Sequence, residues 1–219
     1  MVGLTTDSSS EIYLISSGNS GSDSGNFDLE SQLKPIKETT SDISHQNIRL
    51  YYEAQLSQKD TFIVDMEAES PLHYDSTTGR IHINPKHQGF EFYDLRQSIA
   101  HEIGHKIQFD VMEGLGDEFV SVIQQAMDTV ETRLPYFLSL IENDDIFNNM
   151  IVSDILSALS KSNIEGAFGH KKEYWEIDGR IEAEIFANMF SATVVNDELA
   201  LKFFEDEFKN LFSIFKKLF

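Results

Sequence analysis

The sequence predicts an α+β fold, in which a small antiparallel sheet with an edge strand precedes a mostly helical remainder. Short segments bounded by turn-forming residues lie between residues 61 and 84, as is typical of strands. From residue 94 onward the apolar residues instead recur at helical spacing over long segments. The chain has 219 residues, of which 41% are hydrophobic, and this is enough for one sizeable core.

The first 45 residues differ in composition from the rest of the chain. They are rich in Ser, Gly, Thr and Asp, and residues 16–26 have the composition of a flexible linker. We therefore predict a flexible or partly ordered arm over residues 1–45, with a short strand at 11–15, and a folded domain over residues 46–219. An ordinary frayed terminus accounts for the same composition and stays open as an alternative.

The predicted sheet occupies the segment before the first long helix. Residues 48–56 fit a helix or a strand, whereas residues 61–66 have the pattern of a strand. Residues 72–74 and 80–84 are predicted to form a hairpin, with Gly79 supplying the positive φ of its turn. The second of these strands alternates polar and apolar residues, so we expect it to be the edge along which an extended peptide lies.

Helices are predicted for the rest of the domain. The first begins near residue 94, with Asp94 as its N-cap or as an anion in its first turn, and ends before Gly114. Pro135 is expected to kink or divide the second. The phenylalanine-rich face of the last is expected to pack on the core. The helices after the first are predicted at residues 117–142, 144–161, 180–194 and 197–219.

The first helix carries the motif that organises the chain. Residues 101–105 read His-Glu-Ile-Gly-His. His101 and His105 leave one helix face one turn apart and so offer two nitrogen ligands to one Zn²⁺. Glu102 points at another angle, where it reaches a water on the metal, which is the position of a general base. The apolar flanks, and Gly104 as a place for another backbone to approach, argue against a surface helix with two unrelated histidines.

A third protein ligand is expected from a second helix. Glu184 has Asn188 one turn later on the same face, where the amide is predicted to hold the free nitrogen of a ligand histidine. Glu182 is the alternative ligand, although it has no such partner one turn on. A helix surface with scattered acidic groups is the remaining interpretation.

Composition excludes several function classes. The chain has no cysteine, so a zinc ion must take His, Asp or Glu ligands. The net charge of −20 disfavours nucleic acid and anionic membranes as partners, and it suits a basic substrate or a basic inhibitor. No signal peptide and no membrane-spanning run is predicted, which fits either a cytoplasmic protein or export by a route that needs no such signal.

Several segments together resemble a known family. Residues 101–105 with residues 184–190 resemble the gluzincin branch of the zincin metallopeptidases. Residues 154–159 and 169–175, taken with them, are similar to zincin-like domains at the C-termini of phage minor head proteins and bacterial polymorphic toxins. The similarity spans roughly residues 74–190. It departs from thermolysin-like enzymes, in which the third ligand follows the first motif closely, because position 184 lies 79 positions after position 105.

The resemblance implies a zinc-dependent peptidase of zincin-like fold, with His101, His105 and Glu184 as ligands and Glu102 as the base. Its substrate would be a protein or peptide. A toxin or effector with one host protein or a peptidoglycan stem peptide as target, and with a basic inhibitor or immunity protein, is one form of this hypothesis. The alternative is a non-catalytic phage or secretion-system protein that zinc stabilises for structural or binding purposes.

A loop with two glycines precedes the helix of Glu184 and offers further candidates. A zinc peptidase needs a donor besides the metal for the developing oxyanion, and His170 or Tyr174 is in the right region. The other interpretation is that Tyr174 and Trp175 are core aromatics and that His170 caps a turn.

Overall fold

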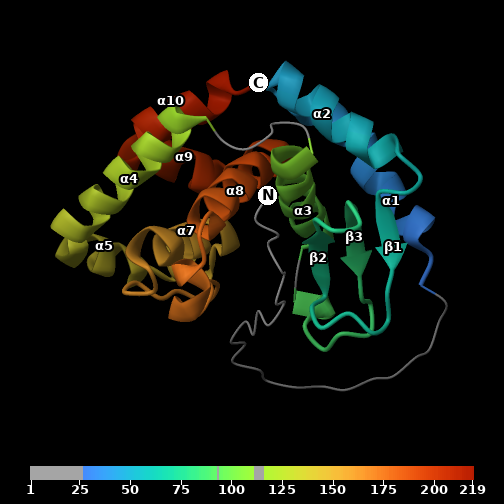
Figure 1. The fold of residues 1–219 in the computed structure, drawn as a ribbon, viewed down its shortest axis with the longest axis horizontal. Coiled ribbons are helices and arrows are strands. Elements are labelled where there is room, and N and C mark those ends of the chain that lie inside the picture. Colours follow the sequence, from blue (N-terminus) through green and yellow to red (C-terminus); the bar gives the residue numbers. More distant parts are fainter. Residues whose placement is uncertain (1–26, 93, 111–115) are drawn as a thin grey trace.

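The computed structural model describes residues 27–92, 94–110 and 116–219 (Figure 1). In these ranges the chain is α+β and mostly helical, with a small three-stranded mixed sheet, which confirms the predicted α+β class and the mostly helical remainder. The strand predicted at residues 11–15 lies outside the described residues. Over the described ranges, no helix combines the length and the apolar character needed to cross a bilayer.

Two helices precede the sheet. Helix α1 (Leu29–Glu38) lies within the segment predicted as an arm, and a short 3₁₀ turn, η1 (Thr40–Asp42), follows it. The next segment, ambiguous in the sequence, is helix α2 (Gln46–Ser57). His45 caps it, because its Nδ1 accepts a hydrogen bond from the backbone N–H of Ile48. The buried side chains of α2 recur every three or four residues, which selects a helix: Ile48, Tyr52, Gln55 and Leu56.

The sheet has the strand order β1-β3-β2. Strands β2 (Leu72–Asp75) and β3 (Arg80–Ile83) form the predicted antiparallel hairpin, in which Gly79 has a φ of +68°. Strand β1 (Phe62–Val64) pairs with β3 in parallel. The sheet is therefore mixed, and the expectation of a purely antiparallel sheet is wrong.

The prediction that residues 80–84 form an edge strand is also wrong. Strand β3 is the central strand, since β1 and β2 pair with its two sides. Its alternation reflects one buried face, on which Ile81 and Ile83 are fully buried, rather than a free edge. Within the described residues, β2 is the edge strand next to the long helix α3 (Leu95–Asp110), and it packs on that helix.

Helix α3 pairs with helix α8 (Arg180–Val195) at the centre of the molecule, with the sheet on the α3 side and α7 on the α8 side (Figure 1). Asp94 caps α3 as predicted, with its Oδ1 2.9 Å from the backbone nitrogen of Gln97. Gly104 lets the two helices come close, because a Cβ at this position would lie 2.9 Å from the Cα of Ala187. The predicted close backbone approach is thus confirmed.

The other helices differ from the prediction mainly in where they break. The first break separates α4 from α5 at Arg133, two residues before Pro135, as expected. Two further breaks were not expected. Asn149 caps α7 through its Oδ1, and Phe208 leaves helical geometry with a φ of −131°. The segments are α4 (Asp117–Thr132), α5 (Leu134–Ile141), α6 (Asp144–Asn148), α7 (Met150–Ser160), α9 (Glu198–Glu207), α10 (Lys209–Lys217), and the 3₁₀ turns η2 (Phe90–Phe92) and η3 (Lys172–Glu176).

The C-terminal helices close the core, as predicted for their phenylalanine-rich face. Phe204 and Phe215 are fully buried, and the ring of Phe215 lies 5.4 Å from that of Phe186 on α8. The terminal residue, Phe219, packs its ring against Phe190 of α8 and against Tyr51 of α2. Phe219 therefore links α2 to α8, on the helix that carries Glu184.

The contact at Gly104 gives a testable prediction. We expect Gly104→Ala to lower the free energy of unfolding by about 1–3 kcal/mol, because the added methyl meets backbone that cannot rotate away. Gly116→Ala is the matched control, since a Cβ there meets nothing within 4 Å. Urea denaturation of both variants measures the difference, and equal stabilities would contradict the proposed tight helix contact.

Candidate metal centre

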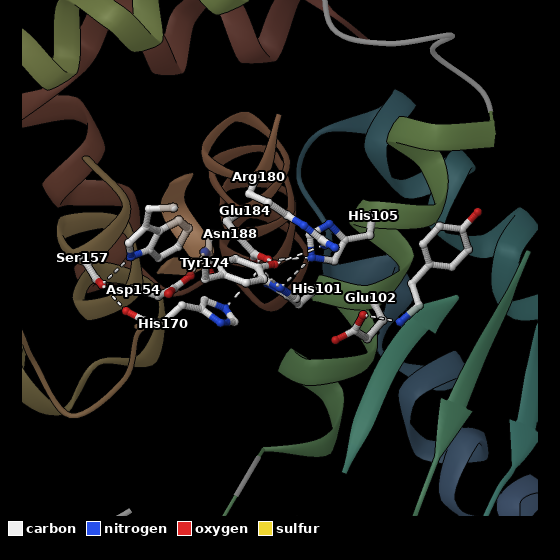
Figure 2. A network of polar contacts seen from close by, with 12 residues as sticks. His101, Glu102, His105, Asp154, Ser157, His170, Tyr174, Arg180, Glu184 and Asn188 are labelled. Atoms are coloured by element: carbon white, nitrogen blue, oxygen red, sulfur yellow. Dashed lines mark hydrogen bonds and ion pairs between the residues drawn. The ribbon is translucent and has the colours of Figure 1, made fainter. Parts of the chain in front are cut away.

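Side chains from three helices and one loop converge between α3 and α7 (Figure 2). His101, Glu102 and His105 come from α3, and Glu184 comes from α8. Because the helices touch at Gly104, the carboxylate of Glu184 lies beside both imidazoles. The structure thus brings together the three residues that the sequence proposed as ligands, across 79 residues of chain.

The three candidate donors form a nearly regular triangle. The Nε2 atoms of His101 and His105 are 3.1 Å apart, and the Oε2 of Glu184 lies 3.1 Å from the first and 3.5 Å from the second. Tetrahedral coordination with bonds of 2.0–2.2 Å places neighbouring donors about 3.3–3.6 Å apart. The observed spacing therefore fits one divalent metal ion.

The burial of Glu184 also fits a metal. Its side chain is 4% exposed, and its Oε2 accepts no hydrogen bond from any described residue. A buried, ionised carboxylate needs a positive partner, and a cation at the centre of the triangle would supply it, as a proton on His101 does in the metal-free protein. The side chains of His101 and His105 are 21% and 12% exposed, so the histidine side of the site stays within reach of solvent.

The charges of the site are strongly coupled. Burial lowers the pKa of His101, but the neighbouring carboxylates of Glu184, Glu102 and Asp154 outweigh it and raise this pKa to about 9. Burial raises the pKa of Glu184, but the surrounding histidines, His105 first, hold it well below its usual range. The carboxylate is therefore ionised and needs a positive partner, either a proton on an imidazole or a metal ion.

Glu102 lies outside the triangle and faces the sheet. Its Oε2 accepts a hydrogen bond of 2.7 Å from the backbone N–H of Tyr74, which lies on edge strand β2. This contact orients the carboxylate next to the histidine pair. It also joins α3 to β2 at the site itself.

His170 and Tyr174 lie on the other side of the Glu184 carboxylate. The hydroxyl of Tyr174 donates a hydrogen bond to Glu184 Oε1, and the Nε2 of His170 lies 3.8 Å from the same oxygen. The two rings stack with centroids 3.9 Å apart, and the guanidinium of Arg180 lies 5.1 Å from the centre of the Tyr174 ring. Trp175 packs edge-on against both rings and, unlike either of them, is enclosed in the core.

Two expectations about the second helix have different outcomes. Glu184, rather than the half-buried Glu182, belongs to the group that can hold a metal. The expected contact between Asn188 and a ligand histidine is wrong. The Nδ2 of Asn188 donates instead to Asp154 Oδ2 at 2.6 Å, because this part of α8 packs against α7 as well as α3.

Asp154 is the site residue that the sequence reasoning missed as a candidate. It lies on α7, is 6% exposed, and joins His170 and Glu184 in a second group of potential ligands. The signal was present in the sequence, since Asp154 is the only charged residue among the apolar and small residues of that helix. An isolated acidic side chain on a helix that is buried over residues 151–160 needs a polar or positively charged partner, and it therefore indicates a candidate functional site.

A matched pair of variants tests the metal site. We expect Glu184→Gln to weaken Zn²⁺ binding by at least about 100-fold, because the amide removes the charged donor that faces both imidazoles. Glu182→Gln changes the same residue type on the same helix outside the group and should bind as the parent does. Equilibrium dialysis with elemental analysis measures both, and equal affinities of the two variants would rule out Glu184 as a ligand.

The pH dependence of binding follows from the charge of His101. Its pKa of about 9 leaves the imidazole protonated at neutral pH in the metal-free protein, whereas a metal ligand must be neutral. Binding therefore displaces a proton, and the affinity should rise about tenfold per unit between pH 6.5 and 8. Calorimetry in buffers of different ionisation enthalpy reports the released proton. A flat affinity over this range would contradict the charge state inferred for His101.

Comparisons with family models, with curated proteins and with solved structures find no match for this chain. The case for a metal site therefore rests on the distances, burial and charges of the chain's own side chains. These give a His101/His105/Glu184 group that can hold a metal ion, in a mostly helical α+β fold.

Proposed function

We propose that the chain is a zinc-dependent metallopeptidase of the zincin type, with His101, His105 and Glu184 as metal ligands and Glu102 as general base. The single observation that carries the proposal is the donor triangle with a separate carboxylate beside it. Imidazole and carboxylate donors at this spacing suit Zn²⁺, and the absence of cysteine leaves these as the ligand types available.

The number of donors favours a catalytic site over a structural one. Structural zinc sites take four protein ligands, whereas catalytic sites take three and keep one position open. Within the described residues, the group that contains both histidines of α3 has three members. The partial exposure of the two imidazoles leaves room for an incoming molecule on that side.

In the proposed hydrolysis of a peptide bond, the metal ion and the side chains have different tasks. When bound, a zinc ion polarises a carbonyl group and lowers the pKa of water to about 7. In the proposed mechanism Glu102 accepts the proton of the attacking water and passes it to the leaving amine. For the first role its carboxylate must keep one oxygen free, and the hydrogen bond from Tyr74 engages the other, Oε2.

Tyr174 or His170 is the proposed donor to the developing oxyanion. The support is their place beside the Glu184 carboxylate, to which the Tyr174 hydroxyl donates its one proton in the metal-free structure. Arg180 lies over the Tyr174 ring and also directs an Nη1 nitrogen to its hydroxyl at 3.4 Å. A donor held in this way stays neutral, because burial and the Glu184 charge raise the Tyr174 pKa well above its ordinary value.

We propose a protein or peptide substrate that lies along β2 in extended form. The support is that β2 is an edge strand and that Glu102 meets the chain at its Tyr74. The net charge of −20 favours a basic partner, whether substrate or inhibitor, and fits a toxin or effector with a basic immunity protein. Nucleic acid and anionic membranes are disfavoured for the same reason.

The test of the mechanism is Glu102→Gln. The amide keeps the size of the side chain but accepts no proton, so hydrolysis should fall about 10²–10⁴-fold while Zn²⁺ content stays that of the parent. Mass spectrometry of a mixed peptide library follows cleavage, and elemental analysis follows the metal. Glu182→Gln serves as the control that retains both.

The outcomes separate the proposal from its alternative. If Glu102→Gln cleaves as fast as the parent, the assigned mechanism is wrong. If the parent holds zinc but cleaves none of the peptides, the alternative of a metal-stabilised phage or secretion-system protein without catalysis gains support.

A further inference from the structure

The carboxylate of Glu184 faces a separate set of ligand-type groups with its second oxygen. Its Oε2 lies in the triangle with His101 and His105, whereas its Oε1 lies 3.8 Å from His170 Nε2. Asp154, His170 and Glu184 each offer a donor atom, and these atoms all lie within 4.8 Å of one another. Glu184 therefore belongs to two groups that share one carboxylate (Figure 2).

Asp154 has an unsatisfied oxygen in this second group. It is only 6% exposed, and its Oδ2 accepts the hydrogen bond from Asn188 at 2.6 Å. Its Oδ1 is buried and has no hydrogen-bond partner among the described residues. An ion in the triangle would satisfy Glu184 Oε2 but would leave Asp154 Oδ1 without a partner among the described residues, and a buried carboxylate oxygen in that state calls for a second cation or a proton.

The loop that carries His170 is fixed on α7. Gly169 has a φ of +146°, and a Cβ there would lie 2.7 Å from Ser157 Oγ, so only glycine fits at this point. The carbonyl of His170 accepts a hydrogen bond of 2.8 Å from the hydroxyl of Ser162. Asp154 lies on the same helix, one turn before Ser157. The imidazole and the carboxylate are thus held in place by one rigid support.

We propose that Asp154, His170 and Glu184 bind a second divalent transition-metal ion, with Glu184 bridging it to the ion of the His101/His105 site. One imidazole and two carboxylates suit Zn²⁺ or Mn²⁺. With His170 as a ligand of this ion, the oxyanion donor of the proposed mechanism is Tyr174. A bridging carboxylate is consistent with the separation of about 3.5–4 Å found in two-metal sites. The hydrogen bond from Tyr174 to Oε1 is compatible with this role, because a carboxylate oxygen has two lone-pair directions.

The competing account is a single ion with Asp154 neutral. Burial raises the pKa of Asp154, so a proton on its carboxyl would also relieve the buried charge. The two accounts differ in stoichiometry, since the neutral carboxyl leaves one ion per chain. The second site rests on the proposed first metal site, because Glu184 belongs to both groups. The experiment must therefore distinguish failure of the second site from failure of the first.

The test counts metal ions on the full-length chain. The protein is stripped with a chelator, dialysed against Zn²⁺ or Mn²⁺, and analysed for bound metal per chain. We expect two equivalents for the parent, and one for Asp154→Asn, which keeps the size of the side chain and a partner for Asn188. His170→Gln should also hold one equivalent, and Glu182→Gln should hold two.

A spectroscopic readout accompanies the count. Two Mn²⁺ ions joined by a carboxylate are magnetically coupled, so the parent should give the electron paramagnetic resonance spectrum of a coupled pair. Asp154→Asn should give the spectrum of an isolated ion. Circular dichroism identifies a variant that fails to fold, and if Asp154→Asn fails, the more exposed His170→Gln decides.

Each outcome has a distinct meaning. One equivalent in the saturated parent overturns the second site and leaves the proposed function standing. No bound metal overturns both. Two equivalents in the parent and also in a folded Asp154→Asn or His170→Gln variant overturn the assignment of the second ion to this group.

Discussion

The close packing of α3 on α8 is the constraint on which the whole site depends. Gly104 follows the first histidine by three residues. Because it has no side chain, the backbone of Ala187 packs directly against it, at a distance that a Cβ would not allow. Ala187 is one helical turn from Glu184, so the same contact that joins the helices carries the carboxylate to the imidazoles. Tight packing is therefore a condition of the donor geometry.

The packing of these helices buries two carboxylates. Asp154 and Glu184 are both enclosed, and each has one oxygen that a neutral partner satisfies, Asn188 for the first and Tyr174 for the second. The other oxygen of each carboxylate has no hydrogen-bond partner within the described chain. Desolvated carboxylates in this state are unfavourable unless cations or protons accompany them. The electrostatics and the donor spacing thus indicate the same kind of ligand.

Much of the helical architecture followed from the sequence because helices are set by local signals. The Asp94 cap, the break before Pro135 and the span of the helix that carries Glu184 all depend on residues within a few positions of one another. The sheet order did not follow, because alternation along residues 80–84 reports one buried face and is the same for a central and an edge strand. Which strands flank β3 depends on chain paths that no local pattern encodes.

The sequence by itself determined that His101 and His105 share a helix face and that Glu102 points elsewhere, because the pitch of a helix fixes these directions within one turn. Only the tertiary structure decided that Glu184 rather than Glu182 meets the histidines, and that Asn188 turns to Asp154 instead. Those choices depend on the angle and rotation at which α8 packs between α3 and α7. That geometry arises from interlocking side chains distant in sequence, and the periodicity of a single helix does not contain it.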